Sequence, residues 1–253
     1  MDDARPSILV GIPTSQTGRY RPFDDGVTRF FAYVAQTPDL PFRMSGDAPF
    51  WSQTGVVPAA RNRIVREAIR VGADYIWWLD DDQPFHWQDL EKLFAHHLDA
   101  VLPLSPRRVA PFLPLLNDRF IDDWRSQQHW LRPHEAGLIP VASAGLAGLL
   151  IKTACFAAIG TDGWFEFVHP PDAPDDYAED YPFYKRLAST GVQLYCDLDV
   201  RFGHQVSCTA YLVKQQGQWV TVLADSSPFV AIPQPQHPLS VAPVKPAGKV
   251  TLQ

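Results

Sequence analysis

The feature that most constrains this chain is a short apolar run that ends in three adjacent carboxylates. The run Tyr75–Leu79 is followed directly by Asp80, Asp81 and Asp82. An apolar run of this length predicts a buried strand, covered on both faces as in a parallel sheet. Three acids at its end repel one another and are costly to desolvate unless a cation lies among them. Because ligands of open α/β sheets bind beyond the carboxyl ends of strands, the run predicts a metal site and its place in the fold.

The flanking patterns alternate strands with helices. Ser7–Ile12 and Ala100–Leu104 have the short apolar character of strands. Pro58–Val71 predicts a helix, because it starts with a proline and is followed by Gly72, which suits the position after a last turn. Trp87–Leu98 predicts a second amphipathic helix. This order is typical of βαβ units, so we expect an α/β fold with a mostly parallel central sheet flanked by helices.

The second half of the sequence is less regular. Its expected elements are the strands Leu138–Ala142 and Leu149–Lys152, the helix Glu179–Ser189 and the strand Val192–Cys196. A very acidic loop spans residues 172–180, ahead of that helix. Residues 226–253 are rich in proline and lack periodicity, which predicts an extended tail.

Composition limits the classes of protein that need to be considered. The chain has 253 residues and a net charge of −6, which argues weakly against a surface that coats nucleic acid. No apolar run approaches the ~18 residues of a membrane span, and the acidic N-terminus lacks the apolar core of a signal peptide. Three widely spaced cysteines, Cys155, Cys196 and Cys208, indicate reduced thiols. We therefore expect a cytoplasmic protein.

The acid triplet is the first candidate for chemistry. In an extended chain Asp80 and Asp82 point to the same side and Asp81 to the other. Mg²⁺ and Mn²⁺ prefer oxygen ligands, usually one or two carboxylates with substrate phosphates completing the shell. Asp80 and Asp82 are therefore the natural pair for a metal–diphosphate. An acidic cap of the next helix would account for one aspartate, but not easily for three.

Three further positions have chemical potential. Arg61 falls within the apolar stripe of its helix, near the end whose dipole favours an anion, so it needs a phosphate or carboxylate partner. Glu179 and Asp180 start a helix, where they either compensate the dipole or take a proton from a sugar hydroxyl. His204 follows a strand terminus, which leaves a metal-ligand role open beside the commoner structural one.

The order of these motifs resembles a known family. In chain order the motifs are Ile12-Pro13-Thr14, Ala60-Arg61-Asn62, Trp78 to Asp82, Gly145 to Lys152, Glu179 to Phe183 and Phe202-Gly203-His204. They resemble GT-A-type glycosyltransferases of the family 2 kind, especially the short stand-alone ones of phages and bacteria. The resemblance covers roughly residues 7 to 210. It implies a Rossmann-like GT-A domain over residues 1–225, with a nucleotide-sugar half up to about residue 104 and an acceptor half after it.

The resemblance also implies a donor and a metal. The donor is a nucleotide-sugar, with UDP-sugars the family default, and the metal is Mn²⁺ or Mg²⁺. The Asp-x-Asp motif of the family matches Asp80-Asp81-Asp82. By that match Asp82 would bind the metal, Asp80 the metal or the donor ribose, and His204 would complete the coordination.

The remaining site residues follow from the same resemblance. The segment Pro13, Thr14 and Ser15 would hold the base and ribose of the donor. Arg61 and the metal would stabilise the departing nucleoside diphosphate. The Glu179-Asp180 motif lies at the acceptor side, and in an inverting hexosyltransferase Asp180 would be the catalytic base.

Two other functions and several acceptors stay open at the sequence level. The same fold could serve as a non-catalytic nucleotide- or carbohydrate-binding module, since the chain contains 8 tryptophans suited to sugar stacking. The metal site could instead perform nucleotidyl transfer or phosphoester hydrolysis. The acceptor could be a glycan, a small molecule or a modified DNA base in a phage-infected host cytoplasm, with Arg107 and Arg108 tracking phosphates. Oligomeric state is not encoded in any motif.

Overall fold

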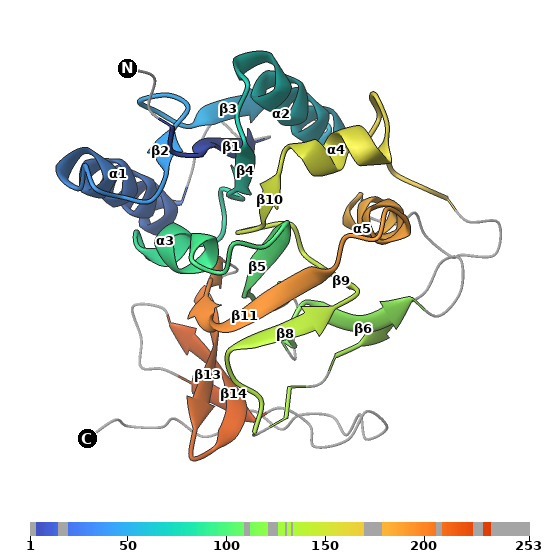
Figure 1. Ribbon diagram of the computed structural model, residues 1–253. Helices are drawn as coiled ribbons and strands as arrows, with labels where there is room; N and C mark the ends of the chain where they lie inside the picture. The colour runs from blue at the N-terminus through green and yellow to red at the C-terminus, as the bar shows by residue number, and fades with distance from the viewer. Residues whose placement is uncertain are drawn as a thin grey trace.

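The computed structural model places an eight-stranded sheet at the centre of the molecule (Figure 1). It describes residues 4–14, 20–108, 112–120, 126–129, 131–132, 134–169, 179–205, 209–224 and 230–233. The strands of the sheet, in chain order, are β1 (Ser7–Thr14), β2 (Arg43–Met44), β3 (Phe50–Gln53), β4 (Tyr75–Trp78), β5 (Ala100–Leu104), β8 (Leu138–Val141), β10 (Leu150–Lys152) and β11 (Leu194–Arg201). Their spatial order is β2-β1-β4-β10-β5-β11-β8, and β3 also pairs with β1.

The sheet is mixed, with parallel pairs in the majority. Strand β1 runs parallel to β2, β3 and β4, and β11 runs parallel to β5. Strand β10 is antiparallel to both of its neighbours, β4 and β5, and β8 is antiparallel to β11. The expected α/β fold with a mostly parallel central sheet flanked by helices is thus confirmed.

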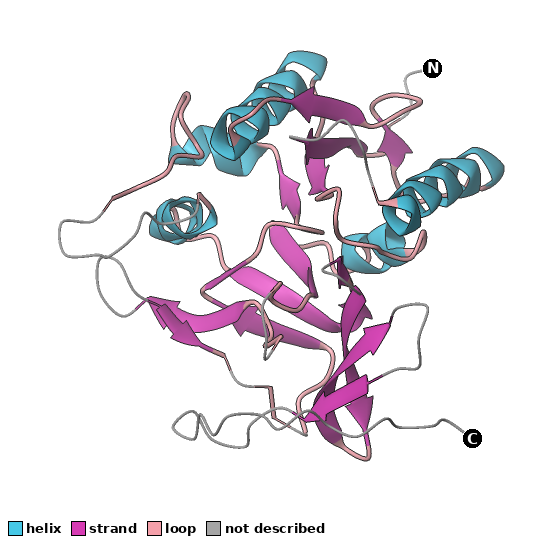
Figure 2. Cartoon of the chain, turned by 180° about the vertical axis from the view of Figure 1, so that it is seen from behind, coloured by secondary structure: helices cyan, strands magenta, loops and turns pink. Residues whose placement is uncertain are grey.

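Helices cover both faces of this sheet, as Figures 1 and 2 show from opposite sides. The helices are α1 (Arg21–Gln36), α2 (Val57–Val71), α3 (Asp89–Phe94), α4 (Ala154–Ile159) and α5 (Asp180–Ser189). Helices α1 and α3 pack on one face, and α2, α4 and α5 pack on the other. None of the described helices is both long and apolar enough to cross a membrane.

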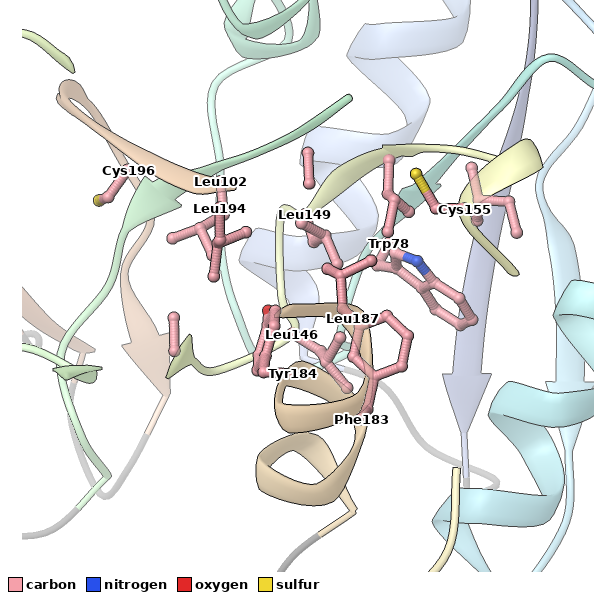
Figure 3. Packing of buried hydrophobic residues seen from close by; sticks show 14 of the residues in the cluster. Trp78, Leu102, Leu146, Leu149, Cys155, Phe183, Tyr184, Leu187, Leu194 and Cys196 are labelled. Carbon is pink, nitrogen blue, oxygen red and sulfur yellow. The ribbon is translucent and has the colours of Figure 1, made fainter. Parts of the chain in front are cut away.

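The consecutive tryptophans of β4 belong to different faces because side chains alternate along a strand. Trp77 packs with α1 and α3, where its ring lies 5.0 Å from that of Phe30. Trp78 packs with the opposite group of helices, and Figure 3 shows it beside Phe183 and Leu187 of α5. Both indoles are fully buried, so β4 is fixed from both sides and holds the start of the acid triplet in place.

Two smaller sheets complete the described chain. One contains β12 (His204–Gln205), β13 (Thr209–Gln215), β14 (Gln218–Ala224) and β15 (Val230–Pro233), all antiparallel. The other contains β6 (Leu116–Phe120), β7 (Ser126–Gln128) and β9 (Ser143–Ala144). Strand β15 lies within the segment predicted as an extended tail, where it pairs with β14. The remaining tail residues, 226–229 and 234–253, lie outside the described residues.

Several predicted boundaries are wrong. The helix expected over Trp87–Leu98 is only the six-residue α3, and His97, beyond its end, adopts a left-handed φ of 54° before β5 begins. The strand expected over Val192–Cys196 runs instead from Leu194 to Arg201. The 16-residue helix α1 was not expected at all, although the helix over Pro58–Val71 is confirmed as α2.

Candidate functional site

An acidic cavity of about 360 Å³ lies beyond the carboxyl ends of β1 and β4, beside the N-terminus of α2. Its lining residues are Pro13, Thr14, Tyr20, Thr54, Val57, Ala60, Arg61, Asp80, Asp81, Asp82, Arg108, Phe167 and Glu179. A second cavity, of about 420 Å³ between α5 and the strands β6 and β8, has one acid in its lining, Asp118. The converging carboxylates therefore single out the first cavity as the candidate site.

The three adjacent aspartates turn toward different partners. Strand β4 ends at Trp78, and the amide of Gln83 bonds the carbonyl of Asp80 at 3.1 Å, which closes a turn. The chain is therefore not extended here, so the condition under which Asp80 and Asp82 are expected to point to one side is not met. Asp80 faces Arg61, Asp81 accepts a 2.6 Å hydrogen bond from the Thr14 hydroxyl, and Asp82 faces Arg108.

Arg61 joins two carboxylates in the buried floor of the cavity. Its Nε donates to Glu179 Oε1 at 2.9 Å, and its Nη2 donates to Asp80 Oδ2 at 3.1 Å. The guanidinium also lies 5.7 Å from the ring centroid of Trp78. Burial lowers the pKa of Arg61, but the charges of Asp80 and Glu179 outweigh it and raise the pKa above its ordinary value. The predicted need of Arg61 for an anionic partner is met by carboxylates.

The charge of Asp81 depends on its neighbours. Burial raises the pKa of Asp81, while the hydrogen bond from Thr14 opposes that rise. The charges of Asp82 and Asp80 raise the pKa further. A positive charge entering the cavity would relieve this repulsion, which is the role expected of a bound cation.

Asp82 pairs with His204, which is itself not among the residues that line the cavity. The amide of Gln205 donates to the Asp82 carbonyl at 2.7 Å, so β12 is tied directly to the acid turn. His204 Nδ1 lies 2.9 Å from the carbonyl oxygen of Pro106, which can only accept, so Nδ1 bears the hydrogen. His204 Nε2 lies 3.5 Å from Asp82 Oδ2 and accepts a 3.1 Å hydrogen bond from Arg108 Nε.

This pair fits one side of a metal coordination sphere. A ligating histidine generally donates its other ring N–H to a carbonyl or carboxylate, as His204 does to Pro106. One carboxylate, one imidazole and the oxygens of a diphosphate make a donor set that Mn²⁺ or Mg²⁺ accepts. Within the described ranges, no group of three or more His, Cys, Asp or Glu side chains could by itself hold a metal ion. The metal role of Asp80 stays a prediction, and both of its oxygens lie 3.1 Å from Arg61 nitrogens.

The acidic motif at the start of α5 is divided between two environments. Glu179 lines the cavity and binds Arg61. Asp180 is not among the lining residues, and its Oδ1 accepts a 2.8 Å bond from the amide of Tyr181. Burial, followed by the neighbouring Glu179, raises the pKa of Asp180 to about 6, against the opposing effect of Arg61. A carboxylate with this pKa is suited to accept a proton near neutral pH.

Exposed apolar side chains surround the acidic floor. Tyr20, Val57 and Phe167 line the cavity and are 37%, 37% and 52% exposed. No sequence pattern distinguishes this rim, because many of the described aromatic residues belong to the core instead. Pro13 and Thr14 lie in the lining as predicted, whereas Ser15 lies outside the described residues, as does the acidic loop up to residue 178.

Fold and site together define an α/β protein with an acidic, apolar-rimmed cavity at the carboxyl edge of its sheet. No protein-family model matches the sequence, and no curated protein is significantly similar to it. Among solved structures, A197 from STIV is similar with a TM-score of 0.48 and 15% identity, over 95% of this chain and 98% of that one.

Two enzymes show weaker structural similarity. The nucleoside-diphosphate-sugar pyrophosphorylase from Vibrio cholerae RC9 has a TM-score of 0.40 and 13% identity, over 76% of this chain and 91% of that one. TarS 1-349 from S. aureus, solved with UDP-GlcNAc, has a TM-score of 0.40 and 11% identity, over 78% of this chain and 57% of that one. With TM-scores under 0.5, the function of this chain has to be argued from its own residues.

Proposed function

We propose that this chain is a metal-dependent glycosyltransferase that moves a sugar from a nucleotide-sugar donor, with a UDP-sugar favoured, to a hydroxyl acceptor. The charge balance of the cavity is the observation that supports this most. Four carboxylates, Asp80, Asp81, Asp82 and Glu179, stand against two guanidiniums, Arg61 and Arg108. The lining thus has a formal charge of −2, which repels a free diphosphate and favours one that enters with a divalent cation.

The shape of the cavity suits the two ends of such a donor. Asp82 and His204 would hold Mn²⁺ or Mg²⁺, and Arg108 beside them would face the diphosphate. Tyr20 and Pro13 offer apolar surface for a base, and the Thr14 end of β1 lies between that surface and the acid turn. Bound metal would stabilise the negative charge of the leaving diphosphate.

The residues of this chain would do the rest of the chemistry. Arg61 holds Asp80 and Glu179 in fixed positions, and its positive charge offsets theirs. Asp180, ionised at neutral pH with a pKa of about 6, is proposed as the base that takes the acceptor hydroxyl proton in an inverting transfer. Glu179 is committed to Arg61 and is proposed as a positioning residue.

Calorimetric titration with UDP-, GDP- and dTDP-sugars, in Mn²⁺ and in EDTA, tests the donor site. We expect one donor to bind only with metal, and to lose at least tenfold in affinity in Asp82→Asn, because that variant removes a charged metal ligand. Asp39→Asn, an exposed acid outside the cavity, is the matched control. Failure of every donor to bind in Mn²⁺ would overturn the proposal.

Product analysis separates transfer from its alternatives. Release of nucleoside diphosphate that stops in Asp180→Asn, while donor binding survives, indicates a glycosyltransferase. Release of pyrophosphate would indicate nucleotidyl transfer, and binding without turnover would indicate a binding module. Activity with glycans, small hydroxyl compounds and hydroxymethylated DNA across a salt series would identify the acceptor class.

A further inference from the structure

We infer that Arg108 is an exchangeable counter-ion: its guanidinium occupies the metal position of Asp82 and His204, and a divalent cation displaces it onto the donor diphosphate. This inference rests on the proposed nucleotide-sugar function. It adds that Arg108 contacts Asp82 and His204 in the donor-free protein and the diphosphate in the donor complex.

The guanidinium uses the same electron pairs that a metal would need. Arg108 Nη2 donates to Asp82 Oδ2, and Arg108 Nε donates to His204 Nε2 at 3.1 Å. Since His204 Nδ1 already donates to Pro106, Nε2 is the sole lone-pair position of that ring. A cation coordinated by Asp82 Oδ2 and His204 Nε2 therefore cannot coexist with both Arg108 hydrogen bonds.

The two hydrogen-bond acceptors, Asp82 and His204, are held in place, whereas the side chain of Arg108 can move. The side chains of Asp82 and His204 are 11% and 8% exposed, and the bond from Gln205 to the Asp82 carbonyl holds them together. The side chain of Arg108 is 63% exposed. Exchange of the cation thus requires a change of rotamer in one exposed side chain, and no change in the buried pair.

The backbone immediately before Arg108 is anchored, so a moving guanidinium stays at the cavity. The amide of Arg107 donates to the Leu113 carbonyl at 2.7 Å, and the amide of Leu115 donates to the Ser105 carbonyl at 3.0 Å. Arg61, the other cation of the lining, is buried between Asp80 and Glu179 and has no comparable freedom. Arg108 is therefore the cation that can follow the diphosphate.

The inference predicts effects of opposite sign from one substitution. Arg108→Ala removes the competitor of the metal, so Mn²⁺ should bind the donor-free protein about tenfold more tightly than it binds the wild type. The same variant lacks a phosphate partner, so UDP in saturating Mn²⁺ should bind about tenfold more weakly. A merely structural role for Arg108 would weaken both.

The experiment is titration of Mn²⁺, followed through the electron paramagnetic resonance signal of the free ion, with and without UDP. Arg108→Gln keeps an N–H donor on a shorter side chain without the charge, and should behave as Arg108→Ala does. Arg63→Ala removes an exposed positive charge on α2, outside the cavity lining, and should match the wild type in both titrations. Thermal unfolding of each variant verifies that it is folded.

The outcomes distinguish this inference from the function on which it rests. Equal Mn²⁺ affinity in wild type and Arg108→Ala, with binding lost in Asp82→Asn, would overturn the exchange and leave the donor-site proposal standing. Tighter Mn²⁺ binding in Arg108→Ala, without binding of UDP or any nucleotide-sugar, would support the exchange and overturn the donor site. Absence of Mn²⁺ binding in every protein, with and without UDP, would overturn both.

Discussion

Arg61 Nε donates a 2.9 Å hydrogen bond to Glu179 Oε1, across 118 positions of sequence. The same guanidinium binds Asp80, 19 positions away at the end of β4. One buried cation therefore connects the helix α2, the acid turn and the start of α5 on one face of the sheet. The geometry on which the proposed donor and acceptor sides depend is set by this side chain.

Removal of that cation should be strongly destabilising. In Arg61→Met the apolar stem is kept, but two largely buried carboxylates lose their shared partner, a loss of about 3–5 kcal/mol. Urea denaturation at pH 7 measures it. The matched control is Arg66→Met on the same helix, whose ion pair with Asp162 is about half exposed and should contribute under ~1 kcal/mol.

The double variant Arg61→Met/Glu179→Gln tests the cause. If uncompensated charge is the cause of the loss, neutralising Glu179 should recover a substantial part of the free energy of unfolding. Equal stability of Arg61→Met and Arg66→Met would contradict the interpretation that Arg61 is the buried partner of both Asp80 and Glu179.

The sequence predicts that Arg61 faces inward and needs an anionic partner, but it does not identify that partner. Arg61 was identifiable because a charge in an apolar helical stripe needs a partner, whereas the choice between a phosphate and carboxylates depended on a residue 118 positions away. The acid triplet likewise lies after β4 as predicted, but the turn gives its three carboxylates different partners, Arg61, Thr14 and Arg108. The pairing of Asp82 with His204 follows from the family resemblance and from no local pattern, because it depends on long-range strand packing.

Asp180 should make the stability of the protein depend on pH. Its folded pKa of about 6 exceeds its ordinary value of 3.8, so the folded state binds more protons between these values and loses stability as pH rises through them. Asp180→Asn removes this penalty. The free energy of unfolding of the variant minus that of the wild type should therefore be about 2 kcal/mol larger at pH 7.5 than at pH 4.

Urea denaturation of both proteins across this pH range is the measurement, with Asp39→Asn as an exposed control. For the proposed transfer with Asp180 as base, kcat/KM should rise as pH increases through about 6 and then level off, since the base must be ionised. A stability difference that does not change with pH would show that Asp180 titrates normally.

Gly148 should tolerate no side chain. It has a φ of +79°, and a Cβ added there would lie 2.2 Å from Pro103 Cγ and 2.9 Å from Phe202 Cε2. Its amide also donates a 2.7 Å bond to the Trp78 carbonyl, next to the acid turn. We expect Gly148→Ala to destabilise by about 3 kcal/mol or more, from strain and overpacking together.

Gly72→Ala is the control for that substitution. Gly72 has a φ of +67° but nothing within 4 Å of an added Cβ. Gly72→Ala should therefore lower the free energy of unfolding only by the backbone strain, about 1 kcal/mol. Thermal unfolding should therefore separate the two variants clearly. Similar melting temperatures would mean that the β10 segment can move away from Pro103.

The apolar rim should contribute to nucleotide affinity without affecting the metal. Tyr20 and Phe167 are exposed at the cavity, where an aromatic face adds about 1–3 kcal/mol when it stacks on a base. Tyr20→Ala should weaken UDP binding in saturating Mn²⁺ by about tenfold or more, and leave Mn²⁺ affinity of the donor-free protein unchanged.

Calorimetry with UDP and with pyrophosphate shows whether the loss of affinity arises at the base or at the phosphates, since pyrophosphate has no base and should bind both proteins equally. Val71→Ala, an exposed apolar residue at the far end of α2, is the control. Equal losses for UDP and pyrophosphate would place Tyr20 at the phosphates, and would assign base stacking to Phe167 or to neither.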